Sequence, residues 1–440
     1  MRKKMNIVTH YLTEHAGDSD IRYNGRQFYL YDPRTRFWQT RTDSEAGRYL
    51  YNALGARATV SDVKNILAAI RLDARFDFPA VSTASRACVL ANNGRVNLAN
   101  GQLEAVAKSD FEHRHVNFDF IADAKWTQAP AFVRYVKSSL DVDLQKPLAV
   151  CANKEKERRS LLVQILGYAI SELYGAKKMV VLIGPSNAGK TVILNLLRFV
   201  IGEGSYTPIS LDDLSNRFRS SLLLDTSMVI NDELASKGLR NLDMLKKIIS
   251  GEPIIVEKKG IQPEIYTPHV KCVFAANALP SLKEYDGQNA FSERLQLLTF
   301  PHSVARDDWD IELTSKLIEE RHAIFSCVIH ELGDFAKTLK FADDPDAETV
   351  AADYRRSTTS VLTFIDECCV RQSETYTVLS DFYQSYCNFC DDECLDALSK
   401  PDFRAQLRQL GYEFRKKRPY STANPMSSVM GLAIKNTGEV

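Results

Sequence analysis

The stretch LIGPSNAGKTVILNLL, residues 182–197, has the form of a strand end, a glycine-bracketed loop and the first turns of a helix. The apolar run MVVLI at 179–183 is typical of a buried strand, and TVILNLLRFVI at 191–201 is typical of a largely apolar helix. Glycines let such a loop fold tightly enough for its N–H groups to point inward. Because the following helix N-terminus adds a partial positive charge, the stretch predicts a phosphate site.

The loop fits the pattern GxxxxGK[ST] at every fixed position. We expect the Lys190 ammonium to reach the β- and γ-phosphates of ATP and the Thr191 hydroxyl to hold Mg²⁺. A chance match is the alternative, but a strand before the loop and a helix after it favour nucleotide binding. The predicted nucleotide-binding residues are Gly184, Pro185, Ser186, Asn187, Ala188, Gly189, Lys190 and Thr191.

Two adjacent carboxylates end the next apolar strand, SMVINDEL at 227–234. We expect Asp232 to hold the magnesium through its water shell and Glu233 to orient and deprotonate the attacking water. Two solvated carboxylates at a strand end would look the same, but the phosphate loop upstream favours the catalytic interpretation.

Two further polar residues follow at the end of VKCVFAAN and in NAFSERLQLLTFP. The Asn277 amide can bond both the γ-phosphate and the attacking water, although an ordinary turn before Pro280 is the alternative. Arg294 is the candidate for a guanidinium that a neighbouring subunit presents to the transition state. A surface salt bridge is the alternative for Arg294.

Candidate nucleic-acid contacts lie in two places. GEPIIVEKKG puts Lys258 and Lys259 at a predicted hairpin tip, where they are solvated lysines or, in a ring, contacts to the phosphates of a single strand. Residues 360–440 read as helix, helix, helix and two short strands, an order that suggests a winged helix. The basic residues of this region favour a domain that contacts DNA, and a domain that contacts another protein is the alternative. The predicted DNA contacts of this region are Arg415, Lys416, Lys417 and Arg418.

The alternation of strand and helix over 179–300 predicts an α/β core with a parallel sheet. Residues 1–150 carry aromatic hairpins, including RQFYLYDPRTRFWQT, and predict an N-terminal α+β domain for ring assembly or docking. We assign 151–345 to the ATPase domain, with a long amphipathic helical stretch over 310–339. Residues 346–440 form the predicted winged-helix domain.

Composition narrows the class of protein. Hydrophobic residues make up 45% and charged residues 25%, as in ordinary soluble proteins, and the formal net charge is zero. No global basic field therefore draws the chain to nucleic acid, so such contacts must come from local patches. We find no signal peptide and no apolar span, and we expect a cytoplasmic protein without membrane contact. The CxxC of Cys387 and Cys390 has no matching second pair, which favours reduced thiols over a zinc site.

The order GPSNAGKT, VINDE, GEPIIVEKKG, FAANALP and ERLQLLTFP resembles that of superfamily 3 helicases, the hexameric AAA+-like motors of viruses, phages and plasmids. The closer resemblance is to the phage and poxvirus-type primase–helicase family, whose members carry an NG-x-[LV]-[DN]-L segment, here residues 93–98, and end in a winged helix. The resemblance implies that Lys190 and Thr191 bind phosphate and magnesium, that Asp232 and Glu233 form the acidic pair and that Asn277 is the sensor. It also implies a finger acting in trans for Arg294 and DNA contact for Lys259.

Three features depart from the family pattern. Glu252 stands where the family usually has Asp, and Glu293 stands where a second basic residue usually precedes the finger. The chain also shows no catalytic primase domain. We therefore expect a helicase without primer synthesis.

The resemblance implies a homohexameric DNA helicase of a mobile element, active in the cytoplasm of a bacterial host. Its expected cofactors are ATP and Mg²⁺, and its expected partners are single-stranded and forked DNA, with a separate primase or polymerase as a candidate. Three alternatives stay open: an origin-binding initiator that uses ATP as a switch, a nucleic-acid-sensing ATPase in defence, and a monomeric phosphate-loop kinase of a small molecule.

Overall fold

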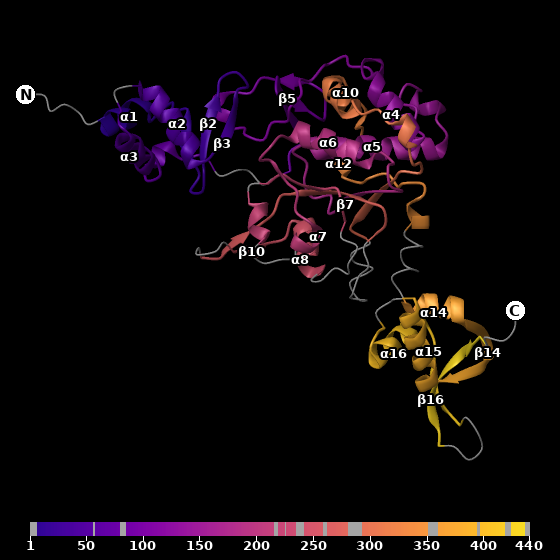
Figure 1. Ribbon diagram of the computed structural model, residues 1–440. Helices are drawn as coiled ribbons and strands as arrows, with labels where there is room; N and C mark the ends of the chain where they lie inside the picture. The colour runs from indigo at the N-terminus through magenta and orange to yellow at the C-terminus, as the bar shows by residue number, and fades with distance from the viewer. Residues whose placement is uncertain are drawn as a thin grey trace, which may run out of the picture. The chain divides into compact units, whose positions relative to one another are not determined.

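The computed structural model divides into two compact units, residues 1–345 and 346–440 (Figure 1). It describes residues 7–55, 58–79, 85–214, 219–224, 226–234, 242–257, 262–279, 293–350, 360–393, 397–418 and 424–435. Over these ranges, none of the helices is both long and apolar enough to cross a membrane.

A five-stranded parallel sheet organises the first unit. Because the strands are parallel, all their carboxyl ends meet at one edge of the sheet. The predicted α/β core with a parallel sheet is therefore confirmed. The strand order is β13 (Leu295–Thr299), β7 (Met179–Ile183), β12 (Lys271–Ala276), β9 (Met228–Asn231) and β8 (Tyr206–Thr207).

Both faces of this sheet are covered, which explains why apolar residues dominate its strands. Every residue of β7, β12 and β13 is buried. Figure 1 shows helices α5 and α6 above β7 in the view and helices α7 and α8 below it. The bounds of these helices are α5 (Asn153–Ile170), α6 (Lys190–Ile201), α7 (Leu211–Leu214) and α8 (Leu242–Ser250).

The core of the sheet extends into residues that precede 150. Phe132, Val136 and Leu140, on helix α4 (Pro130–Leu140), belong to the same apolar cluster as the strands and α6. The Glu320 carboxylate accepts the N–H groups of Ala131 and Phe132, at 2.8 and 2.9 Å, and so caps the start of α4. The division of residues 1–345 at residue 150 stays a prediction.

The helical stretch expected over 310–339 is broken into three helices, so the prediction of one long amphipathic stretch is wrong. They are α10 (Leu313–Glu319), α11 (Arg321–Glu331) and α12 (Phe335–Thr338). Helix α11 is buried continuously from Ala323 to Ile329. Ser326 is tolerated there because its hydroxyl donates to the His322 carbonyl and accepts the Ile121 N–H.

The N-terminal part of the first unit contains two small antiparallel sheets, ordered β1-β2-β3 and β4-β5-β6. The predicted aromatic hairpin is confirmed, with Asp32 paired to Phe37 at the turn. The elements of this part are α1 (Ile7–His15), β1 (Ile21–Tyr23), β2 (Phe28–Asp32), β3 (Phe37–Arg41), α2 (Asp43–Leu54), α3 (Val60–Ile70), β4 (Cys88–Ala91), β5 (Gly94–Asn97) and β6 (Leu103–Glu104).

Shorter elements complete the first unit. A two-stranded antiparallel sheet joins β10 (Ile254–Val256) and β11 (Glu264–Tyr266). The 3₁₀ helices are η2 (Ala74–Phe76), η3 (Lys108–Asp110), η4 (Trp126–Gln128), η5 (Leu148–Val150), η6 (Arg219–Leu223) and η7 (Arg306–Asp308).

The second unit has its own core, built by aromatic residues such as Phe364, Phe382 and Phe403. The three predicted helices and two final strands are present, but a strand between the first two helices, β14, was not expected from the sequence. The sheet order is β14-β16-β15 and the pairing is antiparallel. The elements are α14 (Ser360–Cys368), β14 (Cys369–Val378), α15 (Leu379–Asp392), α16 (Lys400–Gln409), β15 (Phe414–Lys417) and β16 (Met426–Ile434).

Candidate nucleotide site

The glycine-bracketed loop lies between β7 and α6, at the carboxyl edge of the sheet. Gly189 has a φ of 91°, a left-handed conformation that favours glycine, and a Cβ there would meet the Tyr135 ring at 2.8 Å. A Cβ on Gly184 would clash with the Phe300 carbonyl. The Tyr135 hydroxyl also donates to the Gly189 carbonyl at 2.8 Å. The loop is therefore closely packed against α4 and the segment that follows β13.

Lys190 is the first residue of α6 and is 7% exposed. Its Nζ donates to the carbonyls of Gly184 and Pro185, at 2.7 and 2.6 Å, and to Asn277 Oδ1 at 3.0 Å. Burial lowers the pKa of this ammonium group. The loop carbonyls thus hold the ammonium at the place where the motif predicts phosphate oxygens.

Asn277 directly follows β12, the strand beside β7. Besides accepting from Lys190, its amide donates to Ser186 Oγ at 3.2 Å. The structure therefore brings Asn277, Lys190 and the loop together although they are distant in sequence. This contact is a consequence of the parallel order, because neighbouring strands end at the same edge.

Asp232 follows β9 and lines the same cavity as Lys190 and Thr191. Its carboxylate pairs with the Arg198 guanidinium of α6, at 2.7 and 3.3 Å. The sequence analysis did not single out Arg198. Its position about two helical turns after Lys190 places both residues on a similar face of α6, and this spacing could have identified it. Glu233 is exposed and is not among the residues that line the cavity.

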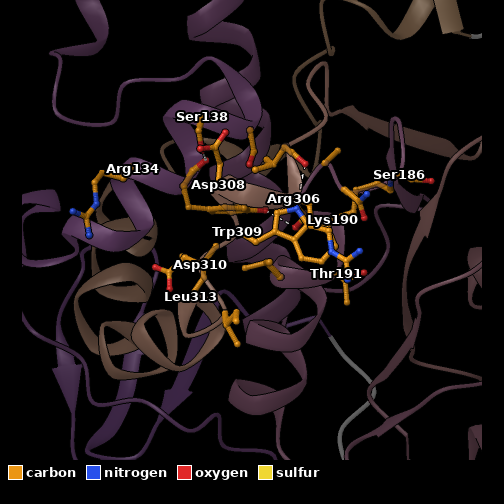
Figure 2. Close-up of a pocket in the computed structure, with 18 of the residues that line it drawn as sticks. Arg134, Ser138, Ser186, Lys190, Thr191, Arg306, Asp308, Trp309, Asp310 and Leu313 are labelled. Atoms are coloured by element: carbon orange, nitrogen blue, oxygen red, sulfur yellow. Dashed lines mark hydrogen bonds between the residues drawn. The ribbon is translucent and has the colours of Figure 1, made fainter.

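The cavity has a volume of about 1290 Å³ and opens between the loop, α4 and residues 304–316 (Figure 2). In the view of Figure 2, Ser186 and Arg134 lie on opposite sides, with Trp309 between them. The motifs contained no signal for this wall of the cavity. The side chains that sequence reasoning missed are Arg134, Tyr135, Arg306, Trp309, Asp310 and Lys316.

Charges of both signs line this wall. The Lys316 ammonium pairs with the Asp310 carboxylate at 2.7 Å, which holds the pKa of that carboxyl below its usual value. Arg134 lies close enough to lower it further. Asp232 and Asp308 are the remaining carboxylates of the cavity. The cavity thus offers cations for phosphate oxygens and carboxylate oxygens for a metal or a hydrogen-bond donor.

The segment after β13 is hydrogen-bonded to the phosphate loop. The Phe300 N–H donates to the Ile183 carbonyl at 2.7 Å, and the Val304 N–H donates to the Asn187 carbonyl at 3.0 Å. Between them, the Ser303 hydroxyl donates to the Ser186 carbonyl at 2.9 Å. These bonds join the start of the wall formed by residues 304–316 directly to the loop.

Arg294 lies at the opposite edge of the sheet. Its carbonyl accepts the N–H of Met179, the first residue of β7, at 2.7 Å, and its Nε donates to Ser250 Oγ at 3.4 Å. The strand β13 that follows it has five residues and so spans about 16 Å. Arg294 therefore does not reach the loop of its own chain.

The predicted DNA contacts are placed only in part. Lys258 and Lys259 lie outside the residues that the structure describes, between β10 and β11. In the second unit, Arg415 and Lys416 are exposed on β15, and Arg418 is exposed directly after it. Lys417 is half-buried, with its Nζ 5.7 Å from the centroid of the Tyr376 ring. Arg415 also pairs with the Glu413 carboxylate at 2.8 Å. A DNA phosphate would have to compete with this carboxylate for the Arg415 guanidinium.

Comparison with known proteins gives three findings. Residues 182–294 match a family of unknown function, DUF5906. A Sputnik virophage protein named "Putative helicase V13" is 28% identical over 143 residues, which make up 30% of this chain and 18% of that protein. The chain thus spans less than a fifth of the length of this relative. The solved apo structure of the NrS-1 C-terminal region, residues 305–718, is similar with a TM-score of 0.52 at 9% identity, covering 98% of this chain and 100% of that one. The last likeness concerns the fold alone.

Proposed function

We propose that the protein is an ATP-dependent DNA helicase of a phage or other mobile element, active in DNA replication as a hexameric ring. The observation that carries the proposal is the convergence of the phosphate loop, Lys190, Asn277 and Asp232 in one cavity at the carboxyl edge of the sheet. The likeness to a virophage protein named as a helicase supports it. The enzyme class is a nucleotide hydrolase.

The chain's own groups supply most of the proposed chemistry. Lys190 exchanges its loop carbonyls for the β- and γ-phosphate oxygens, and the Asn277 amide positions the γ-phosphate. The Thr191 hydroxyl and the Asp232 carboxylate line the cavity together, and such hard oxygen ligands suit Mg²⁺. When bound, the ion neutralises charge that develops on the phosphates. Glu233, next to Asp232, is the proposed acceptor of the proton from the attacking water, a role that requires its side chain to reach the cavity, which it does not line in this structure.

Hydrolysis is proposed to need a second subunit. Arg294 lies at the amino edge of the sheet, remote from its own loop, and a head-to-tail ring presents one face of each subunit to a different face of the next. In that arrangement Arg294 neutralises the transition state in the neighbouring site. Its position supports an arginine that acts in trans over one that acts in its own subunit.

DNA contact is proposed for two regions. Lys258 and Lys259 touch the phosphates of a single strand in the channel of the ring, and the second unit guides the duplex or binds origin DNA. Its element order, α14-β14-α15-α16-β15-β16, supports a winged helix whose β15 carries the basic side chains. Residues 1–150 form a collar that assembles the ring or docks a separate primase or polymerase.

The test is displacement of a labelled strand from forked DNA with ATP and Mg²⁺, with Lys190→Ala as the control. We expect unwinding by the natural protein, and a loss of at least about 100-fold in hydrolysis and unwinding in the variant, since Lys190 would stabilise transition-state charge. Forks with a 3′ tail and with a 5′ tail are both needed, because the polarity is not fixed by the motifs.

Other outcomes point to the alternatives. Hydrolysis without unwinding on either fork would contradict the helicase and favour an initiator switch or a nucleic-acid-sensing ATPase. A monomer in size-exclusion chromatography with ATP would remove the trans mechanism and favour a small-molecule kinase.

A further inference from the structure

The wall of the cavity formed by residues 304–316 exposes large apolar side chains. Trp309 is 47% exposed and Ile311 is 95% exposed, yet both line the cavity. The other two tryptophans of the chain, Trp38 and Trp126, are 1% and 7% exposed. An indole with half of its surface open to water inside a cavity leaves apolar area that a ligand can cover.

The Trp309 ring is held in a defined orientation. Its Nε1 donates to the Val304 carbonyl at 3.2 Å, and its backbone N–H donates to the Arg306 carbonyl at 3.3 Å. The Arg306 guanidinium lies 6.0 Å from the ring centroid. The indole is therefore fixed through its polar edge while much of its surface stays open.

A chain of two hydrogen bonds connects this ring to the phosphate loop through one residue. Val304 accepts from the Trp309 indole with its carbonyl and donates to the Asn187 carbonyl with its N–H. The spacing between the phosphate site and the indole is thus set by local hydrogen bonds. A ligand whose phosphates occupy the loop would present its other end to this wall (Figure 2).

We propose that Trp309 stacks on the nucleobase of the bound nucleotide and makes the site prefer purines over pyrimidines. A purine has the larger π face, and stacking accepts either purine because it reads no hydrogen-bonding edge. The inference rests on the proposed function in one respect: the phosphate loop must bind a nucleotide. It adds the residue that recognises the base and the class of base.

The first experiment uses the tryptophan emission of the whole protein in Mg²⁺ buffer. We expect ATP and GTP to quench the emission because Trp309 is the exposed indole. CTP should quench with a weaker apparent affinity, and inorganic tripolyphosphate should compete for the loop without quenching. Equal quenching by tripolyphosphate and ATP would overturn the inference, because the signal would then arise from phosphate binding alone.

The second experiment measures the Kd of ATP and of tripolyphosphate by calorimetry. We expect Trp309→Ala to raise the Kd of ATP about 5- to 150-fold, the range that stacking of one base on an aromatic side chain contributes. The Kd of tripolyphosphate should stay the same, and Trp309→Phe should keep most of the ATP affinity. Tyr51→Ala is the matched control, since Tyr51 on α2 is also 47% exposed and lies outside the cavity.

The outcomes separate this inference from the proposed function. An unchanged Kd of ATP in a folded Trp309→Ala variant would overturn base stacking and leave nucleotide binding by the loop intact. Absence of binding for both ATP and tripolyphosphate in the natural protein would overturn the nucleotide site itself, and the base site with it.

Discussion

Two lysines, Lys190 on α6 and Lys271 on β12, are buried to a similar degree but lie at opposite edges of the parallel sheet. Lys190 is 7% exposed and adjoins a cavity of about 1290 Å³. Lys271, the first residue of β12, is 3% exposed and lines a cavity of only about 20 Å³. A phosphate has room at the first ammonium group and none at the second.

The hydrogen-bond partners of the two ammonium groups also differ. The Lys271 ammonium donates to the carbonyls of Tyr168 and Ser171, where α5 ends, and lies 4.8 Å from the centroids of the Tyr168 and Tyr174 rings. A cation at a helix C-terminus is stabilised by the helix dipole and by the last carbonyls. Lys271 therefore serves the fold, whereas Lys190 bonds loop carbonyls beside open space. Burial of a lysine alone does not indicate a functional site.

The two lysines suggest that the carboxyl edge of the sheet is functional and the amino edge structural. Arg294 tests this difference with the largest expected effect, because it lies at the amino edge and has a proposed catalytic role. We expect Arg294→Ala to lower the rate of ATP hydrolysis by about 10³- to 10⁵-fold, the range for a guanidinium that stabilises transition-state charge. Mixing Arg294→Ala with Glu233→Ala should restore part of the rate, because some mixed interfaces pair an intact arginine with an intact base.

Absence of recovery in mixtures that exchange subunits would argue against a role in trans. Exchange itself is shown by energy transfer between labelled subunits. An unchanged rate of ATP hydrolysis in Arg294→Ala would show that Arg294 has no catalytic role.

A smaller effect concerns the stability contributed by Lys271. We expect Lys271→Met to lower the free energy of unfolding by about 1–3 kcal/mol, because it leaves the Tyr168 and Ser171 carbonyls without their donor. ATP hydrolysis below the unfolding transition should not change. The midpoint of urea unfolding and the hydrolysis rate measure the two expectations, and a selective loss of hydrolysis would contradict them.

The pH dependence of the free energy of unfolding gives a second test of Lys271. Burial lowers the pKa of Lys271 to about 7, with Glu172 opposing the shift and Arg114 adding to it. Between this value and the unfolded-state pKa of 10.5 the unfolded chain binds more protons, so the free energy of unfolding rises with pH. The difference between the natural protein and Lys271→Met should therefore be larger at pH 9 than at pH 7. Lys137→Met, at a lysine that is 66% exposed, is the matched control.

The smallest effect concerns the ion pair between Arg198 and Asp232. Arg198→Ala frees the carboxylate for magnesium, so we expect the half-saturating Mg²⁺ concentration for hydrolysis to fall by up to about fivefold, the range for a partly exposed ion pair. Asn195→Ala is the matched control, because Asn195 accepts a second bond from Arg198 at 2.9 Å without touching the carboxylate. An unchanged Mg²⁺ requirement would show that the pair does not compete with the ion.

The central part of the fold was predictable because its signals are local. The apolar runs of β7, β9 and β12 and the GK[ST] pattern directly indicate strands and a loop. The parallel order of the strands then brings Lys190, Asp232 and Asn277 to one edge. Each of these residues comes shortly after a strand in the sequence, so its place at the carboxyl edge could be predicted.

The rest of the site depends on contacts that no local pattern records. Tyr135 and Arg134 lie about fifty positions before the loop, in a segment that the sequence analysis assigned to the N-terminal domain. They line the cavity because α4 joins the core of the sheet. Trp309 lies in a polar stretch without periodicity. The strand β14 was missed because polar residues at its centre mask the apolar pattern at its ends, although it pairs with β16 over both ends.

Strand β13 has a mechanical consequence for a ring. It is paired with β7 from Leu295 to Thr299, so one hydrogen-bond ladder joins the two strands along their full length. Arg294 lies at one end of this pair, and the bonds from Ser303 and Val304 to the loop lie at the other. In the proposed ring, a displacement of Arg294 by the nucleotide of the neighbouring subunit would thus pass along this strand pair to the loop of its own subunit. In the proposed ring, this pair of strands would connect two consecutive nucleotide sites directly.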